Sequence, residues 1–158
     1  MAKDKTVPVT VLKTLGGQAP SFDLPVSIKK LDGTKVELKI KAKALRKTEW
    51  AKCRDERQRA VFEGLQAANK TIQAAAEGET PTYLETAIAN LETHGAEASV
   101  REGIALDAQM VLKFADGWSL DEPLTAEGLE LLEDSFGGSL NEIIGSYDRA
   151  IYQGRLGN

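Results

Sequence analysis

Histidine and cysteine, the side chains best suited to acid–base and nucleophilic chemistry near neutral pH, occur once each, as His94 and Cys53. His94 precedes Gly95 at the expected end of a helix, where a cationic or hydrogen-bonding side chain suits the helix dipole. Cys53 falls on the apolar stripe of an expected helix, which favours a small core residue over a nucleophile. One histidine and one cysteine cannot complete a tetrahedral zinc site without two carboxylates.

Carboxylates are plentiful toward the C-terminus, and in principle they could bind a divalent ion or form an acid pair. The candidates are Asp116, Asp121, Glu122, Glu133 and Asp134. The stretch 116–127 lacks the alternating carboxylates of an EF-hand loop, and the glycine pair at 16–17 lacks the Lys-Ser/Thr of a phosphate-binding loop. A solvated acidic surface is therefore the favoured interpretation. We predict a protein without enzymatic activity, and with no catalytic, metal or cofactor site.

Charge is distributed very unevenly along the chain, although the formal net charge is only -4. Residues 29–59 hold 12 Lys or Arg against 5 Asp or Glu, whereas residues 77–148 hold 16 Asp or Glu against Arg101 and Lys113. The two regions could simply be solvated faces, or they could dock on each other or between copies of the chain in a homo-oligomer. Nucleic-acid binding is not expected, because no nucleic-acid motif accompanies the basic segment.

The composition is that of an ordinary globular protein, with 158 residues, 42% hydrophobic and 28% charged. We expect a single domain over residues 1–158. The lone cysteine excludes an intramolecular disulfide and suits a reducing compartment. The N-terminus has no apolar signal segment, and no apolar run approaches the roughly 18 residues of a membrane span. These features predict a soluble cytoplasmic protein.

The first part of the chain, about residues 7–42, has the alternating pattern of β-strands. Val7 to Val11 suggests a short edge strand, and two half-buried strands are expected around 22–28 and 36–40. A two-residue turn between the latter would place their apolar residues on opposite faces. A three-residue loop over 31–33, with Gly33 left-handed, sets Ile28 opposite Val36 and unites them on one face. The outer face would be rich in lysine.

From about residue 45 to 155 the hydrophobic period changes to that of helices. Helices are predicted over 45–77, 82–94, 99–115, 125–135 and from 139 onward, and three of them start with capping-box spacing. These boxes are Thr82 with Glu85, Ser99 with Glu102, and Ser139 with Glu142. The first helix has an expected weak point at Gly64, and residues 64–80 are expected to protrude, flex or pack on another chain. Trp118 and Leu120 should plug the core from a loop.

The fold class is therefore predicted to be α+β, with an N-terminal antiparallel hairpin or small sheet followed by four to five helices. The last helix carries the strongest amphipathic signal, with Leu140, Ile143, Ile144, Tyr147 and Ile151 on one stripe.

Three segments resemble the tail assembly chaperones of long-tailed bacteriophages and prophages. They are residues 41–51 (KAKALRKTEWA), 111–118 (VLKFADGW) and 147–158 (YDRAIYQGRLGN). In that family a strand pair with a lysine-rich end leads into helices, and the chain ends in an Arg-Leu-Gly-Asn-like tail. The resemblance covers residues 22–60 and 100–158 best, whereas the middle of the chain carries none.

The resemblance implies that the protein binds the tape measure protein, keeps it soluble and helps to recruit tail tube subunits. It also implies action in the host cytoplasm and absence from the mature virion. The alternatives are a structural tail or head-tail connector protein, and a small DNA-binding regulator. Candidate partner-binding residues come from the lysine-rich hairpin, the first tryptophan and the C-terminal helix with its tail. They are Lys39, Lys41, Lys43, Trp50, Tyr147, Ile151, Arg155 and Leu156.

Overall fold

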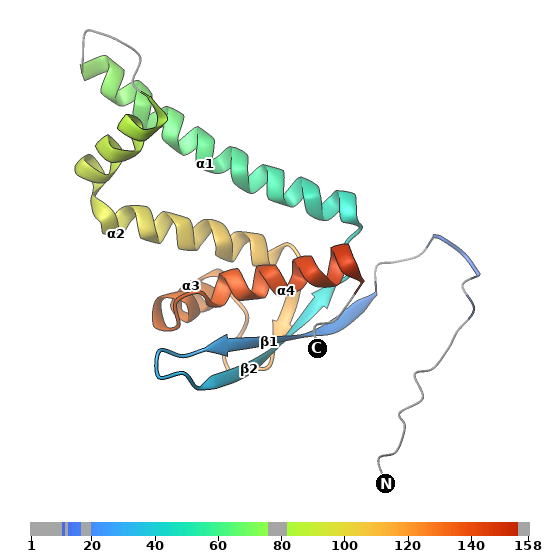
Figure 1. The fold of residues 1–158 in the computed structure, drawn as a ribbon. Coiled ribbons are helices and arrows are strands. Elements are labelled where there is room, and N and C mark those ends of the chain that lie inside the picture. Colours follow the sequence, from blue (N-terminus) through green and yellow to red (C-terminus); the bar gives the residue numbers. More distant parts are fainter. Residues whose placement is uncertain (1–10, 12, 17–19, 76–81, 155–158) are drawn as a thin grey trace.

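A computed structural model describes residues 11, 13–16, 20–75 and 82–154 of the chain. The elements are β1 (Ser21–Lys29), β2 (Lys35–Lys43), α1 (Lys47–Ala75), α2 (Tyr83–Leu112), β3 (Ala115–Trp118), α3 (Ala126–Ser135) and α4 (Ser139–Gln153). The predicted α+β class is confirmed, with an antiparallel sheet and helices that follow its first two strands (Figure 1). The expected strand from Val7 to Val11 lies outside the described residues, except for Val11, which is exposed and not in a strand.

The β1–β2 hairpin has the predicted register, with Ile28 opposite Val36 and Val26 opposite Leu38. The turn closes where the Gly33 N–H donates to the Lys30 carbonyl oxygen at 3.0 Å, and Gly33 has a φ of 87°. A residue with a side chain would be strained there, which explains the glycine. Because the register keeps the alternating apolar side chains of both strands on one face, with Pro25 as the exception, the other face is left to solvent.

Strand β3 is a correction to the sequence-based prediction, which carried the third helix through residue 115 and placed Trp118 in a loop. Helix α2 ends at Leu112, and β3 pairs antiparallel with β2, with Trp118 opposite Ile40. Trp118 packs partly buried against the core, whereas Leu120 is 40% exposed and does not plug it. A four-residue strand is too short to show a period, so only pairing with β2 reveals it.

Helix α1 runs unbroken through Gly64, and the weak point expected there stays a prediction. A single glycine costs a helix only about 1 kcal/mol, and α2 lies beside α1 at this position, since a Cβ at Gly64 would be 3.4 Å from the Glu102 carboxylate. At the start of the helix the carboxylate of Glu49 accepts a hydrogen bond from the Arg46 N–H at 2.9 Å. The predicted end at residue 77 lies outside the described residues.

Helix α2 consists of two segments joined at Gly95, whose φ of 80° and ψ of 161° are not helical. The predicted capping box of Thr82 with Glu85 is present at its start. The second predicted box, at Ser99, is wrong because the second segment begins directly after Gly95. The Ser99 hydroxyl donates back to the Gly95 carbonyl instead, at 3.4 Å.

Helix α3 begins as predicted, with the Thr125 hydroxyl accepting from the Gly128 N–H. Helix α4 does not use the predicted box of Ser139 with Glu142. Gly138 is its N-cap, and the carboxylate of Glu133 in α3 accepts hydrogen bonds from the backbone N–H groups of Gly138 and Leu140, both at 2.7 Å.

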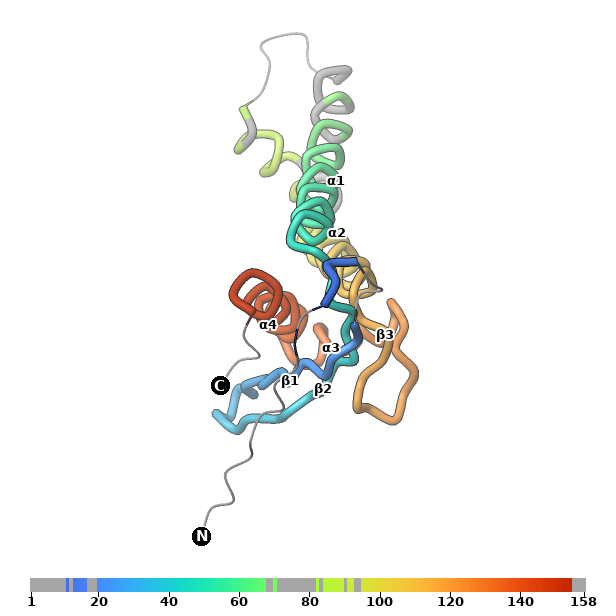
Figure 2. Tube along the Cα trace, turned by 90° about the vertical axis from the view of Figure 1, so that its right-hand side faces the viewer, coloured from blue at the N-terminus to red at the C-terminus, as the bar shows by residue number. Residues whose placement is uncertain are grey.

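The predicted amphipathic character of α4 is confirmed, because its apolar stripe is buried at Leu140, Ile143 and Tyr147. Figure 1 shows α4 lying across the hairpin. In the perpendicular view of Figure 2, α1 and the first part of α2 extend away from the sheet. We call residues 61–75 of α1 and 83–94 of α2 the helical arm. The single-domain organisation expected over residues 1–158 stays a prediction.

Candidate partner-binding surfaces

The outward face of β2 carries the three lysines predicted to bind a partner. Lys39, Lys41 and Lys43 alternate with the buried residues Leu38, Ile40 and Ala42, so they project from the side of the sheet opposite the core. Lys43 also forms an ion pair with Asp116 of β3 at 3.1 Å. We refer to these three exposed lysines, Lys39, Lys41 and Lys43, as the lysine face.

The basic and acidic regions of the sequence dock on each other within one chain. Besides the Lys43–Asp116 pair, Arg57 of α1 binds Asp107 of α2 at 2.6 Å, and Arg54 pairs with Asp148 of α4. The pair with Asp107 accounts for a charged side chain, Arg57, on the side of α1 that faces α2. Ion pairs at such partly exposed positions contribute about 1 kcal/mol at most, so they orient the helices more than they stabilise them.

Trp50 and Tyr147, two of the predicted partner-binding residues, have no exposed surface in this structure. The ring of Tyr147 stacks on Phe114 with centroids 3.7 Å apart, and Trp50 meets both rings edge-on. Both residues are core residues here and cannot contact a client in this conformation. Their rings are buried between α1, α4 and the segment after α2.

The polar atoms of these aromatic residues are satisfied inside the protein. The Tyr147 hydroxyl donates to the Lys43 carbonyl oxygen at 2.6 Å and accepts from the Leu45 N–H at 3.1 Å. The indole N–H of Trp50 donates to Asp148. Burial raises the pKa of the Tyr147 phenol to about 12, because the phenolate would lose its hydration.

The remaining predicted residues lie at the end of α4. Ile151 is partly buried and packs against the core. Arg155 and Leu156 lie outside the described residues. Cys53 also packs partly buried against the core, where the sequence analysis placed it.

The helical arm presents a stripe of apolar side chains on α2 to solvent. Leu84, Ile88 and Leu91 follow the i, i+4, i+7 spacing of one helix stripe, but they are 66%, 46% and 46% exposed. Spacing alone indicates such a stripe. It could not show that the described part of the chain leaves these three side chains largely open to solvent.

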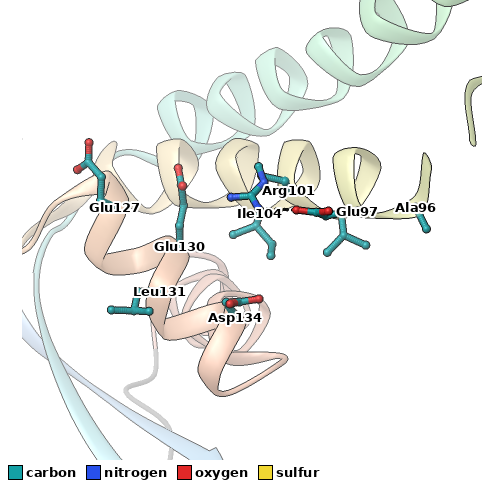
Figure 3. Close-up of a pocket in the computed structure, with 9 residues that line it drawn as sticks. Ala96, Glu97, Arg101, Ile104, Glu127, Glu130, Leu131 and Asp134 are labelled. Carbon is teal, nitrogen blue, oxygen red and sulfur yellow. Dashed lines mark hydrogen bonds and ion pairs between the residues drawn. The ribbon is translucent and has the colours of Figure 1, made fainter. Parts of the chain in front are cut away.

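A groove between α2 and α3 is a second surface that the sequence analysis missed. It has a volume of about 440 Å³ and is lined by Ala96, Glu97, Val100, Arg101, Ile104, Glu127, Glu130, Leu131 and Asp134. Figure 3 shows the acidic side chains of α3 on one side and the Arg101–Glu97 pair of α2 on the other. No sequence pattern could reveal the groove, because its two walls come from separate helices.

Within the part of the chain that the structure describes, no group of three or more His, Cys, Asp or Glu side chains is arranged to hold a metal ion. The helices of the same residues also include none that is long and apolar enough to cross a bilayer.

Charged faces, a partly exposed apolar stripe and an acidic groove are surfaces of the kind that proteins use to bind other macromolecules. A family model for the phage tail assembly chaperones matches residues 1–158, and the chain belongs to this family. This confirms the resemblance seen in the sequence. A chaperone is not a class of enzyme, and its role in tail assembly implies partners among the tail proteins. No curated protein and no solved structure matches the chain.

Proposed function

We propose that this chaperone binds the tape measure protein, keeps it soluble and helps to recruit tail tube subunits during tail assembly. It would act in the host cytoplasm and be absent from the mature virion. The observation that carries the proposal is the exposed stripe of Leu84, Ile88 and Leu91 on the helical arm. A tape measure protein is long, helical and prone to aggregate, so a holdase for it needs apolar surface that its own fold leaves free.

The geometry of the arm suits a helical client. A stripe with i, i+4, i+7 spacing is the form in which an amphipathic helix packs against another helix. Binding the non-assembled client would lower its free concentration and shift it away from aggregation by mass action. The arm also extends away from the sheet, so a long client could run past it without meeting the core (Figure 2).

The lysine face offers a separate surface for the second partner. Lys39 and Lys41 project from the sheet, whereas the stripe lies on the arm. An acidic patch on a tail tube subunit could therefore dock on the lysine face while the arm holds the client. Complementary charge at such a site mainly increases the association rate and selects the partner.

Co-expression with the tape measure protein tests the holdase proposal. We expect a larger soluble fraction of the client with the chaperone than without it. The double variant Leu84→Gln/Leu91→Gln should lose most of this effect. Leu31→Gln is the matched control, because Leu31 is fully exposed at the hairpin turn, away from the arm. An unchanged soluble fraction with the native chain would contradict the proposal.

The same proposal separates a chaperone from a structural tail or connector protein. Mass spectrometry of purified particles should find the tail tube protein in abundance and this chain at background level. Finding it in stoichiometric amounts would favour the structural alternative.

A further inference from the structure

The groove between α2 and α3 combines an apolar floor with an acidic rim. Val100 of α2 is 60% exposed and Leu131 of α3 is 66% exposed, although both line a concave surface. Ala96, Val100 and Ile104 follow one another at every fourth position, and Ile104 continues into the core. At a rise of 1.5 Å per residue this floor extends along α2 for about 12 Å, or some two turns of helix.

Negative charge dominates the rim. Glu127, Glu130 and Asp134 line it from α3, and α2 adds Glu97. Arg101 is the cation of the lining, and it is already paired with Glu97 at 2.8 Å. The hydrogen bond to Glu97 and the charge of Glu97 raise the pKa of Arg101, and the charges of Asp134 and Glu130 add smaller effects. Three carboxylates of α3 therefore remain to attract an incoming cation.

We propose that this groove is a docking site for a cationic amphipathic helix, one that places apolar residues on Val100 and Leu131 and Lys or Arg residues against the rim. The inference rests on the proposed function, because the helix would belong to the client protein, and it names the chemistry of the segment that is bound. Charge complementarity selects this occupant, because an acidic helix would meet like charges along α3. Helices commonly bind such grooves through residues one turn apart.

Binding of designed peptides to the full chain tests the docking site directly. The probe is a labelled Leu/Lys peptide of roughly 14 residues, with leucine at i, i+3, i+4 and i+7. The comparison peptides have the same pattern with Glu in place of Lys, and the same composition in scrambled order. Fluorescence anisotropy should show the Leu/Lys peptide binding at least about tenfold more tightly than either comparison. The affinity should also fall in about 0.5 M salt, where exposed charges are screened.

Variants locate the peptide on the chain. Leu131→Gln should weaken binding about fivefold or more, because it places an amide on the apolar floor. Leu31→Gln is its control, since Leu31 is fully exposed at the hairpin turn and lies outside both the groove and the arm, and binding should stay within about twofold. Glu130→Gln/Asp134→Asn should weaken binding by about fivefold, whereas Asp121→Asn/Glu122→Gln, which removes the same charge outside the groove, should not.

Three results would overturn the proposal. One is absence of binding by the Leu/Lys peptide, and another is equal binding of the Leu/Glu peptide. The third is a native dimer that Leu131→Gln converts to monomer in sedimentation equilibrium, because a second copy would then occupy the groove. The proposed function fails separately, when co-expression with the native chain leaves the client insoluble. If the client stays soluble with both the native chain and Leu131→Gln, the holdase proposal survives and the groove has no part in it.

Discussion

The hydroxyl of Tyr147 donates a hydrogen bond to the backbone carbonyl of Lys43, with the two oxygens 2.6 Å apart. This contact joins α4 to the end of β2, at the point where the chain leaves the sheet for α1. The N–H of Leu45 donates to the same phenol oxygen at 3.1 Å, and Phe114 stacks on the ring. One buried side chain thus holds together the sheet, the start of α1, the end of α2 and α4.

Tyr147→Phe should destabilise the protein by about 1–3 kcal/mol, because it leaves the Lys43 carbonyl and the Leu45 N–H without this partner in a partly buried site. Urea unfolding would measure the loss. Tyr152→Phe is the control, since Tyr152 is 39% exposed, and it should change stability by less than about 0.5 kcal/mol. Equal effects of the two variants would show that these hydrogen bonds do not stabilise the fold.

Stability should fall steeply in alkali as the pH rises from 10 to 12. The pKa of the Tyr147 phenol is raised from 10.0 to about 12 in the folded protein, so the unfolded chain releases this proton first. The unfolded state then binds fewer protons than the native state, and the free energy of unfolding decreases with pH. Urea midpoints across this range should decline less in Tyr147→Phe. A parallel decline in both proteins would exclude Tyr147 as the cause.

Two glycines of α2 should respond to alanine in opposite directions. Gly95→Ala forces a side chain into a backbone conformation that only glycine adopts readily, at a cost of about 1–3 kcal/mol. Gly103→Ala should stabilise by up to about 1 kcal/mol, because Gly103 is helical and its added methyl group meets no atom within 4 Å. Thermal unfolding of both variants gives the comparison. A stabilising Gly95→Ala would mean that α2 is not kinked there.

The cap of α4 should depend on Glu133 and not on the acidic residue beside it. Glu133→Ala removes the acceptor for the N–H groups of Gly138 and Leu140, and should cost about 1–2 kcal/mol. Asp134→Ala removes one charge from the exposed side of the same helix and should have a much smaller effect. Urea unfolding of the two variants measures their free energies of unfolding. Similar losses of stability would argue against the cap.

The ion pair of Arg57 and Asp107 should show measurable coupling between α1 and α2. A double-mutant cycle with alanine at both positions should give about 0.5–1 kcal/mol, reduced for the partial exposure of both side chains. The coupling between Arg101 and Glu97, which are far more exposed, should be smaller. High salt should reduce both values. A coupling energy near zero would show that the ion pair of Arg57 and Asp107 does not stabilise the contact between α1 and α2.

Much of the local structure could be predicted because it depends on neighbouring residues. The hairpin register follows from the alternation of Val26 and Ile28 with polar residues, together with the glycine that the loop requires. The capping box at Thr82 and the stripe of α4 are likewise encoded within a few residues. The family resemblance also came from short segments of sequence, and the family model confirms it over the whole chain.

The candidate surfaces were less predictable, because exposure is a property of the whole fold. Trp50 and Leu84 both lie on apolar helix stripes, yet one is fully buried and the other is 66% exposed. The spacing of apolar residues is the same in both helices. The two side chains differ only in whether a neighbouring element covers them. The Glu133 cap had no signal either, since it joins the end of α3 to the start of α4 across a glycine turn.

The sequence by itself determined the α+β class, most helix and strand positions, the hairpin register and the separation of charge along the chain. These depend on backbone propensity and on periodicities that span one or two turns. Tertiary structure decided which apolar stripes are covered and which charged side chains pair. It also made residues 115–118 a third strand and formed the groove between α2 and α3. Those outcomes depend on contacts between residues far apart in the chain, whose free energies exist only once the elements have packed together.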